Sequence, residues 1–418
     1  MIRASEISLE KGTMWGQAKH TRFYVADVPV FYLPYFAFPV SNQRQTGLLF
    51  PELTSSSTTG VDYQQPFYWN IAPNYDMTIT PRVMTLRGLQ LNTEFRHLGE
   101  KSESMAYVEY LPSDNDLDSQ PDRYFYRIEH QGEINDNWVL GVDFNGLSDD
   151  NYIVDLGSDY YSRADTHLYR TISLNYYSKN LLVGMHVKDF EVLGDTAESY
   201  RALPELKVNY QTPWGKYLTF NLDSELAYFD STSESAPKAT RFHVAPTVAL
   251  PLRSAWGEFV AETSLLQTIY KQENIQDTDL SEDVTRTLGQ ARLFGALYFE
   301  KDEAWFNKDM SMTLEPKIQY LYTSYEDQTD IGQYDSTPLL TDVEGLFRGQ
   351  EFTGLDRISD NNQITLGLTT RMLDKNNREQ FVLSVGQIFY LEDNKVVAAT
   401  KNQDRSALAA EVDWRLNK

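Results

Sequence analysis

Hydrophobic and polar residues alternate along most of this 418-residue chain. In segment 310–322, Leu314, Ile318 and Tyr322 fall on one side of the alternation, while Ser311 and Glu315 fall on the other. Successive side chains of a β-strand point to opposite faces, so this pattern predicts a strand with one apolar and one strongly polar face. The same alternation is found in segments 89–95, 138–145, 172–176, 218–228, 364–372 and 381–389.

Polar, acidic or proline-bearing stretches separate the predicted strands. The long stretches are 114–122, 231–238 and 272–283, and short breaks lie at 178–180 and 212–215. Bacterial outer-membrane barrels likewise have long outer loops and short periplasmic turns. At the usual spacing of such barrels, the pattern predicts roughly sixteen strands from about residue 61 to the end, with a margin of about two.

The composition favours a membrane barrel over a helical membrane protein. The mean hydropathy is -0.48, and no apolar run reaches the roughly 18 residues that a transmembrane helix needs. A transmembrane β-strand needs only about 9–11 residues, of which every second one faces lipid. The 27 Tyr, 21 Phe and 7 Trp residues suit strands and the aromatic girdles of a barrel. A soluble β-sandwich is the alternative that composition alone leaves open.

Charge and residue content exclude several other classes of function. The net charge of -23 argues against a nucleic-acid partner, because no basic region is concentrated enough to neutralise phosphates. The absence of cysteine excludes disulfides, thiolate metal sites and cysteine nucleophiles within this sequence. The six histidines are scattered singly, and no serine is marked as activated. We therefore expect no enzyme, no metal and no cofactor.

The N-terminal region has a different pattern. Residues 14–26 suggest a strand, and residues 28–40 form an aromatic run punctuated by prolines, VPVFYLPYFAFPV. We place a domain boundary near Ser41. The first residues contain no apolar core of a secretory signal, and the alternation at Val412 and Trp414 suggests a strand still in progress. If the chain forms a barrel, we expect the N-terminus to be missing, and either the closing strands lie elsewhere or the C-terminus is missing as well.

Several motifs resemble the LptD family of outer-membrane lipopolysaccharide-assembly proteins. The resemblance is carried by residues 28–51, 68–74, 78–82, 110–114, 345–348, 354–358, 362–363 and 384–390, which span nearly the whole chain. It implies an all-β fold in which a periplasmic β-jelly-roll precedes a large antiparallel transmembrane β-barrel of about 26 strands. Residues 1–40 would then be the C-terminal end of the jelly-roll, and residues 41–418 the N-terminal two thirds of the barrel, which is incomplete here. The cysteines that join the two domains in relatives are absent from this sequence.

The same resemblance implies a function and a location. The protein would insert lipopolysaccharide into the outer leaflet of the cell outer membrane, passing lipid A through a lateral gate and the sugars through the barrel lumen. Its partners would be lipopolysaccharide, outer-membrane lipids, an LptE-like lipoprotein plug, and an LptA-like periplasmic bridge protein bound through the jelly-roll. The N-terminal segment would lie in the periplasm.

The gate is predicted at three prolines near the start of the barrel: Pro66, Pro73 and Pro81. Proline lacks the backbone donor of a sheet, so prolines suit a weakly bonded seam. By motif position, Pro66 and Pro81 match prolines that the family links to the gate, and Pro73 lies between them. The alternative is that these prolines mark turns or bulges.

Two further groups of residues are candidates for the route of lipopolysaccharide. The path of the acyl chains out of the jelly-roll is predicted at four aromatic residues of the junction: Phe31, Tyr32, Tyr35 and Phe36. These residues are equally well interpreted as ordinary core. Asp223, Glu225 and Glu315 are expected to face a wet lumen, although solvated strand faces explain them as well.

Two other functions remain open at this point. A passive porin-type channel would share the barrel, but a jelly-roll-like junction at residues 28–40 would have no role in it. A structural barrel without transport would follow if the gene truly ended at Lys418.

Overall fold

The computed structural model describes residues 2–9, 15–25, 28–40, 44–161, 167–193, 200–276, 278–305, 308–340, 342–396 and 404–415. The chain divides into two compact units. Unit 1 contains residues 1–130 and 145–165, and unit 2 contains residues 131–144 and 166–418. Each unit is described by itself below.

The predicted all-β fold is confirmed. The described residues contain one short α-helix, α1 (Tyr152–Leu156), and one 3-10 turn, η1 (Gly345–Phe347). The strands are β1 (Ile2–Arg3), β2 (Glu6–Leu9), β3 (Trp15–Val25), β4 (Val28–Pro39), β5 (Gly47–Leu48), β6 (Glu52–Ser56), β7 (Gly60–Gln64), β8 (Phe67–Ala72), β9 (Tyr75–Met84), β10 (Gly88–Leu98), β11 (Ser102–Leu111), β12 (Arg123–Glu133), β13 (Trp138–Leu147), β14 (His167–Tyr177), β15 (Leu181–Val192), β16 (Tyr200–Trp214), β17 (Leu218–Ser231), β18 (Lys238–Ser254), β19 (Gly257–Glu273), β20 (Asp283–Leu297), β21 (Phe299–Trp305), β22 (Lys308–Thr323), β23 (Asn361–Asp374), β24 (Glu379–Tyr390) and β25 (Ala409–Trp414).

The N-terminal residues form a small antiparallel sheet of their own. Strand β3 pairs with β1 and β2 in one register and with β4. Strand β4 contains the aromatic, proline-punctuated run and ends at Pro39, just before the boundary predicted at Ser41.

The second sheet of unit 1 begins earlier than the sequence analysis predicted. Strand β6 pairs with β7 in an antiparallel hairpin, and β5 pairs with β8. Strands β7 and β8 both pair with β9 in one register, so they are two pieces of one strand interrupted at Gln65 and Pro66. Strand β9 then pairs with β10, and β10 with β11.

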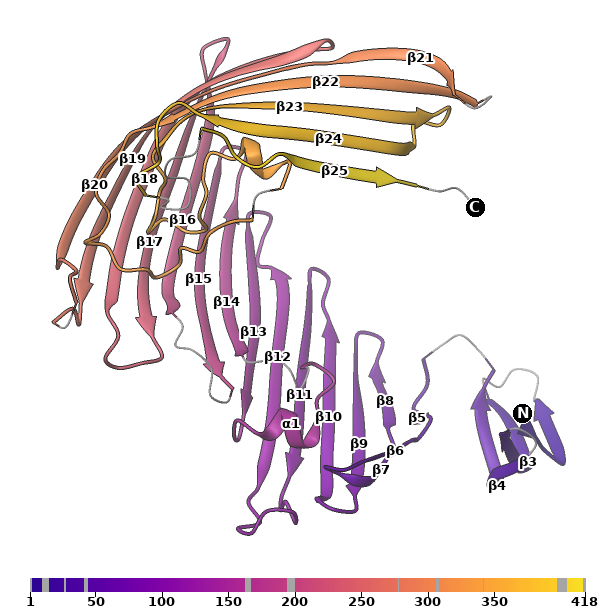
Figure 1. The fold of residues 1–418 in the computed structure, drawn as a ribbon. Coiled ribbons are helices and arrows are strands. Elements are labelled where there is room, and N and C mark those ends of the chain that lie inside the picture. The colour runs from indigo at the N-terminus through magenta and orange to yellow at the C-terminus, as the bar shows by residue number, and fades with distance from the viewer. Residues whose placement is uncertain are drawn as a thin grey trace. The chain divides into compact units, whose positions relative to one another are not determined.

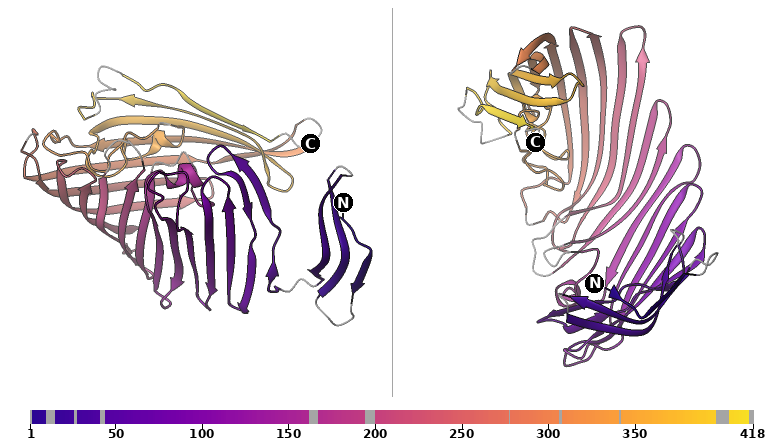
Figure 2. Two further views of the ribbon diagram at one scale, coloured as in Figure 1. Left: turned by 90° about the horizontal axis from the view of Figure 1, so that it is seen from below. Right: turned by 90° about the vertical axis from the view of Figure 1, so that its right-hand side faces the viewer.

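Unit 2 contains one long antiparallel sheet in which each strand from β14 to β20 pairs with the next (Figure 1). Strands β20 and β21 pair with β22 in a single register, and the break between them falls opposite Pro316, which has no amide hydrogen. The sheet continues through β23 and β24 to β25 (Figure 2).

The predicted number of strands is confirmed for the described residues. From Gly60 onward nineteen strands carry labels, and β7/β8 and β20/β21 are each one interrupted strand, which leaves seventeen. One predicted break was wrong, because β16 continues through residues 212–214 and the turn follows at 215–217. The pairing of β16 with β17 continues to Trp214, which lies opposite Leu218, so pairing rather than side-chain pattern sets the end of this strand.

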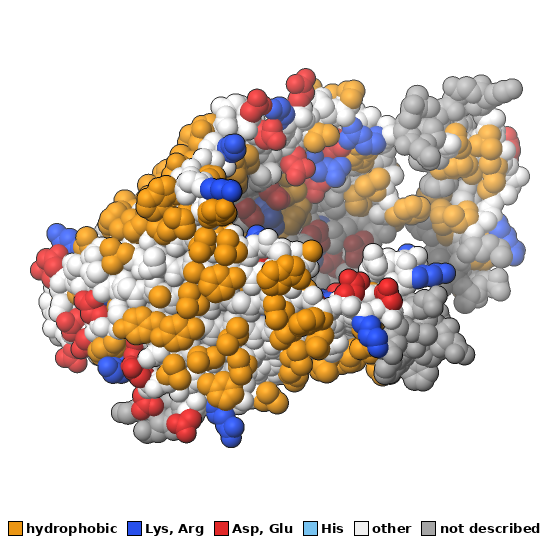
Figure 3. All heavy atoms as spheres, turned by 90° about the horizontal axis from the view of Figure 1, so that it is seen from above, with side chains coloured by type: hydrophobic (Ala, Val, Ile, Leu, Met, Phe, Trp, Pro, Cys, Tyr) orange, Lys and Arg blue, Asp and Glu red, His pale blue; other side chains and the backbone are white. Residues whose placement is uncertain are grey.

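The alternation produces a sheet whose apolar side chains are exposed and whose polar side chains are buried. On β17, Leu226 is 45% exposed while its neighbour Glu225 is 7% exposed. We call the side that bears Glu225 the polar face and the side that bears Leu226 the apolar face. Figure 3 shows hydrophobic side chains gathered in a broad band over the strands, with charged side chains along its margins. This arrangement is the reverse of a water-soluble sheet and fits a strand layer in lipid.

Candidate functional site

The polar face of unit 2 is covered by the long connection between β22 and β23. We call residues 324–340 and 342–360 the long loop. Three of the largest fully buried side chains in the described residues are arginines, and two of them, Arg241 and Arg286, lie on this face. A buried guanidinium is stable only when its donors are satisfied, so the partners of these two arginines define the site.

Arg241 joins strand β17 to the long loop. Its Nε donates to Oε1 of Glu225 at 2.8 Å, and its Nη1 donates to Oδ1 of Asp335 at 2.9 Å and to Oδ1 of Asp356 at 2.8 Å. Its guanidinium also lies 4.6 Å from the ring centroid of Phe229. One cation from the sheet is thus bound by three carboxylates, two of which belong to the loop.

Arg286 and Tyr270 hold the same part of the loop through its backbone. Arg286 donates from Nη2 to the carbonyl of Leu355 at 2.6 Å and from Nη1 to that of Asp356 at 3.0 Å. The hydroxyl of Tyr270 lies 3.1 Å from both the carbonyl of Leu355 and the carboxylate of Asp356, and it can donate to either. Tyr270 lies on β19 and Arg286 on β20, and Arg241 lies on β18. The loop is therefore bound to three adjacent strands.

A small apolar cluster completes the attachment. Ile331 and Tyr334 of the loop pack with Phe229 and Tyr270 of the sheet, and Tyr334 and Phe229 stack with ring centroids 5.6 Å apart. Gln272 accepts a bond from the Tyr334 hydroxyl at 2.7 Å. Burying these rings excludes water from the ion pairs nearby, which strengthens them.

The two loop carboxyls differ in acidity. Burial by itself would raise the pKa of Asp335, but its bonds to Arg241 hold that pKa below the usual range. Burial and the neighbouring Asp335 charge raise the pKa of Asp356 to about 6. The carboxylate of Asp356 also accepts hydrogen bonds from the backbone amides of Tyr334 and Asp335, each at 2.7 Å. Asp356 therefore links two parts of the long loop to each other.

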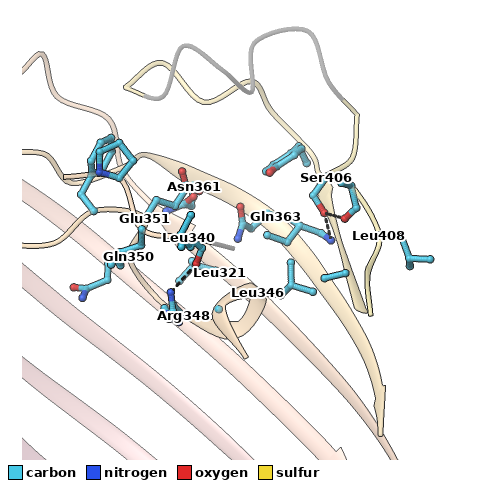
Figure 4. A pocket seen from close by; sticks show the side chains of 18 residues that line it. Leu321, Leu340, Leu346, Arg348, Gln350, Glu351, Asn361, Gln363, Ser406 and Leu408 are labelled. Carbon is cyan, nitrogen blue, oxygen red and sulfur yellow. Dashed lines mark hydrogen bonds between the residues drawn. The ribbon is translucent and has the colours of Figure 1, made fainter. Parts of the chain in front are cut away.

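A cavity of about 490 Å³ lies between the long loop and the ends of β22–β24 (Figure 4). Its walls combine apolar side chains such as Leu321 and Leu346 with polar ones such as Arg348, Gln363 and Ser406. In Figure 4, Arg348 points toward Leu340, whose carbonyl accepts its Nη1 at 3.1 Å. The mixed lining of this cavity specifies no single ligand.

In unit 1 a second connection covers the polar face. Residues 148–161, which we call the α1 loop, lie between β13 and the next described residues. The hydroxyl of Tyr152 donates to Oε2 of Glu109 at 2.6 Å and accepts from Gln90 at 2.8 Å. Arg82 donates to Asp62 at 2.6 Å and to the carbonyl of Leu156 at 3.0 Å. Strands β7, β9, β10 and β11 therefore all contribute to holding α1.

Arg123 forms the centre of the ion pairs that hold both the start of the α1 loop and α1 itself. This side chain is 1% exposed and donates to Asp114 at 2.9 Å, Asp149 at 2.7 Å and Asp155 at 2.9 Å. Arg87 reinforces the group by pairing with Asp114 at 3.0 Å. Both units thus use a buried arginine with three carboxylates to fix a long connection on the polar face.

The first strands of unit 1 are weakly bonded where two prolines lie close together. By register Gln65 is opposite Pro81, and they share one bond, from the amide of Gln65 to the carbonyl of Pro81 at 3.1 Å. On the other edge, the amide of Leu49 donates to the carbonyl of Pro66 at 2.9 Å, and proline has no amide to return. The side chain of Gln65 replaces the missing donor by bonding to the Leu49 carbonyl at 2.9 Å.

Near the turn between β8 and β9, ion pairs centred on Asp76 fix residues 44–46, which lead into β5. Asp76, 2% exposed, accepts from Arg44 at 2.7 Å, from Arg96 at 2.9 Å and from the Tyr68 hydroxyl at 2.8 Å. Arg44 also donates to the carbonyl of Pro73. The entrance to the sheet is thus tightly held, while the strand pairs at Pro66 and Pro81 are thinned.

Comparison with known proteins identifies the family. The family model described as "LPS transport system D" matches residues 121–418, and a second LptD model matches residues 18–99. The chain belongs to the LPS transport system D family. It is 60% identical over 416 residues to the LPS-assembly protein LptD of Pseudoalteromonas atlantica and 43% identical over 423 residues to that of Shewanella frigidimarina, in each case over 100% of this chain.

The chain spans about half of these LptD relatives, covering 55% of each. Among solved structures, Pseudomonas aeruginosa OccD3 aligns over 89% of this chain and 87% of its own, at 10% identity and a TM-score of 0.35, which is too low to support an argument. As a member of the LptD family, this is an outer-membrane protein of a transport and assembly family. The names of the family and its relatives refer to transport and assembly rather than to a catalysed reaction.

The structure separates the three prolines that LptD resemblance assigned to the gate. Pro66 and Pro81 lie at neighbouring positions of adjacent strands, at the interruption between β7 and β8. Pro73 instead lies in the two-residue turn between β8 and β9. The proposed aromatic path is placed on β4, where Tyr32 and Tyr35 are three residues apart on a regular stretch and hence on opposite faces. The side chains of Phe31 and Phe36 lie outside the described residues.

The acidic residues expected on the polar face are there, but each has a partner. Asp223 accepts from Asn209 at 2.5 Å, and Glu315 accepts from Arg371 at 3.0 Å. Tyr68 and Tyr75 flank the turn at Pro73 and point to different faces, Tyr68 toward Asp76 on the polar face and Tyr75 toward Phe95 on the apolar face.

Sequence reasoning missed the arginines and the two loops that they hold. Arg241 and Arg123 each occupy a polar position in an alternating strand, and nothing local distinguishes them from solvated residues. The long loop contains the family-like segments 345–348 and 354–358, which were the one available signal.

Within the described part of the chain, no helix is long and apolar enough to cross a membrane. The same residues contain no cluster of three or more metal-binding side chains.

Proposed function

We propose that this chain is the membrane portion of a lipopolysaccharide translocon, which inserts lipopolysaccharide into the outer leaflet of the outer membrane. The family assignment supports this role. The structural observation that carries the mechanism is the thinned strand pairing at Pro66 and Pro81. Lipid A would leave sideways between strands at this seam, and the sugars would pass along the polar face.

The seam suits a lateral gate because few hydrogen bonds must break to open it. A regular antiparallel pair exchanges two backbone bonds, whereas Gln65–Pro81 and Leu49–Pro66 each have one. In lipid, an unsatisfied backbone group costs several kcal/mol (about 2–7), so pairs that already lack a donor open at a lower cost than regular pairs. The Asp76 cluster would keep the base of the seam in place while its middle opens.

The two faces of the sheet suit the two parts of the cargo. The polar face outside the area covered by the long loop, where Asp223 is exposed, would line a wet lumen that admits sugars and phosphates. The apolar face would contact the bilayer. The small sheet β1–β4 would be the end of a periplasmic jelly-roll from which acyl chains arrive, and Tyr32 and Tyr35 are exposed there, 47% and 54% respectively. Phe31 and Phe36 belong to the same proposed path.

Partners follow from the same proposal. The lumen would hold an LptE-like lipoprotein plug, and the N-terminal sheet would meet an LptA-like bridge protein in the periplasm. The long loop and the α1 loop, both fixed on the polar face, would restrict the lumen until lipopolysaccharide passes.

The test is photo-crosslinking in cells that carry the full-length protein. A photo-reactive amino acid at Tyr68 or at Tyr75 is expected to capture lipopolysaccharide. Replacing both seam prolines (Pro66→Ala with Pro81→Ala) restores two backbone donors, and we expect capture to fall at least threefold. Pro73→Ala is the matched control, because the carbonyl that Arg44 contacts is retained and no ladder donor is gained.

Lipid-free crosslinks at both positions would contradict the gate. If the purified protein also conducts ions while capturing no lipopolysaccharide, the passive porin becomes the better interpretation.

A further inference from the structure

The apolar face of unit 2 contains a groove that the proposed transport route does not use. The groove has a volume of about 780 Å³ and lies over β18, β19, β20, β22 and β23. Leu252, Trp256, Phe259, Ile318 and Leu366 line it, and Gly295 lies on its floor. It is separate from the polar face, where the long loop binds.

The groove exists because a glycine interrupts a row of large apolar side chains. The pairing registers place Leu252 opposite Phe259, Phe259 opposite Gly295, Gly295 opposite Ile318, and Ile318 opposite Leu366. Four of these five positions carry side chains between 43% and 51% exposed. The fifth has none, which leaves a hollow in the middle of the row.

Packing does not explain this glycine. A Cβ atom built on Gly295 would meet only Cγ2 of Ile318, at 3.6 Å, which is ordinary van der Waals contact. Glycine weakens a strand interior and often marks a place where a ligand approaches the backbone. A side chain would therefore fit here without strain, and its absence leaves room for something outside the protein.

We propose that this groove binds one acyl chain of a glycerophospholipid from the periplasmic leaflet of the outer membrane. Nine of its sixteen lining residues are aliphatic or aromatic, three are glycines, and the polar remainder is Arg253, Ser254, Glu258 and Lys317. Exposed apolar side chains of the same face, such as Leu265 and Leu293, lie beside the groove. An unfilled hollow in lipid would lose dispersion contacts on both walls, so a chain that fits it is held more firmly than bulk lipid.

The position of the groove identifies the leaflet. It opens beside Trp256, 69% exposed, in the short turn between β18 and β19. Short turns mark the periplasmic side of outer-membrane barrels, and aromatic residues gather at the level of the lipid headgroups. Lipopolysaccharide occupies the opposite leaflet, so the ligand is a phospholipid. The inference rests on the sheet spanning the outer membrane as proposed above, and it does not require lipopolysaccharide to pass the seam.

The test is native mass spectrometry of the full-length protein purified in a mild detergent. Gly295→Leu fills the hollow, and we expect phospholipid retention to fall at least fivefold. Gly289→Leu is the matched control, because Gly289 lies on the same strand and face, outside the groove, with nothing within 4 Å of a Cβ placed there. The wild-type protein and this control should each retain one phospholipid.

Equal retention in all three proteins, retention in none, or retention of lipopolysaccharide alone would overturn the proposal. If Gly295→Leu does not assemble, Ile318→Ala tests the proposal instead. This substitution removes one wall of the groove and should lower phospholipid retention relative to Ile269→Ala. Ile269 is similarly exposed on the apolar face, at 45% against 51% for Ile318, and does not line the groove. Lipopolysaccharide crosslinking at Tyr68 should be unchanged in these variants, so failure of the groove and failure of the gate give different results.

Discussion

Gln65 lies directly opposite Pro81, and one hydrogen bond of 3.1 Å joins them where a regular antiparallel pair has two. Gln65 compensates on its other edge by donating its side-chain amide to the carbonyl of Leu49 at 2.9 Å. A single glutamine therefore supports the first strand at the point where Pro66 cannot.

This relationship predicts the effect of Gln65→Ala. Loss of the side-chain bond should destabilise the pairing of residues 47–56 by about 0.5–1.5 kcal/mol. Hydrogen exchange of peptides from that segment, measured on the full-length protein, should become roughly two to ten times faster. Gln267→Ala removes a glutamine on β19 that bonds to Thr287, and it should leave residues 47–56 unchanged. Equal exchange in both variants would mean that Gln65 does not support the seam.

Arg241 should be the main attachment of the long loop. Arg241→Ala removes the cation from the buried Glu225 and Asp356 and from the partly buried Asp335, and breaking a buried pair in this way costs about 3–5 kcal/mol. Amide exchange of residues 328–336 should accelerate at least a hundredfold. Arg253→Ala on the same strand is the control, because that side chain is 74% exposed and has one bond to Glu258. A loop that stays protected in Arg241→Ala would show that the apolar cluster suffices.

The raised pKa of Asp356 predicts that the attachment of the long loop to the sheet depends on pH. Its pKa in the folded protein, about 6, lies above that of an unfolded aspartate, so the folded loop binds the proton more tightly. Its contribution is therefore greatest at low pH and is lost as the pH rises through about 6. Asp335 has the opposite shift, and its contribution disappears only as the pH falls below the usual range of an aspartate.

The loop should therefore be most firmly attached at about pH 4–6 and less firmly at pH 7.5. Exchange of residues 328–336, corrected for the intrinsic pH effect, should rise by about tenfold or less between pH 5.5 and 7.5, since one pKa unit corresponds to about 1.4 kcal/mol. Asp356→Asn should flatten this dependence. An unchanged pH profile in that variant would assign the titration to another group.

Tyr68 and Tyr75 should report opposite environments although they lie only seven positions apart in the sequence. Tyr68 faces Asp76 on the polar side, and Tyr75 faces Phe95 on the apolar side. Single cysteines at the two positions, spin-labelled in the full-length protein in liposomes, should differ in collision partners. The label at Tyr75 should collide preferentially with oxygen, which concentrates in lipid, and the label at Tyr68 with a water-soluble nickel complex. The same preference at both sites would contradict the assignment of the faces.

The alternation of side chains could be read from the sequence because it is local. Leu226 and Glu225 fall on opposite faces for the same reason that any two neighbours in a strand do, and only the identities of the residues are needed. The predicted strands, the connectors at 114–122, 231–238 and 272–283, and the family resemblance follow from that local information and from motifs. The family is confirmed, and the gate residues stay a proposal.

The sequence did not reveal which residues meet across long separations. Arg241 meets Asp335 and Asp356, 94 and 115 residues away, and its strand looks like any other alternating strand. Likewise, Gln65 lies opposite Pro81 only because β7 and β8 share one register on β9, and Gly295 forms a groove only because its neighbours in the row come from four other strands. Local pattern determined the two faces of the sheet. Pairing and loop folding, which depend on the sum of many distant contacts, decided where the seam, the loop attachment and the groove lie.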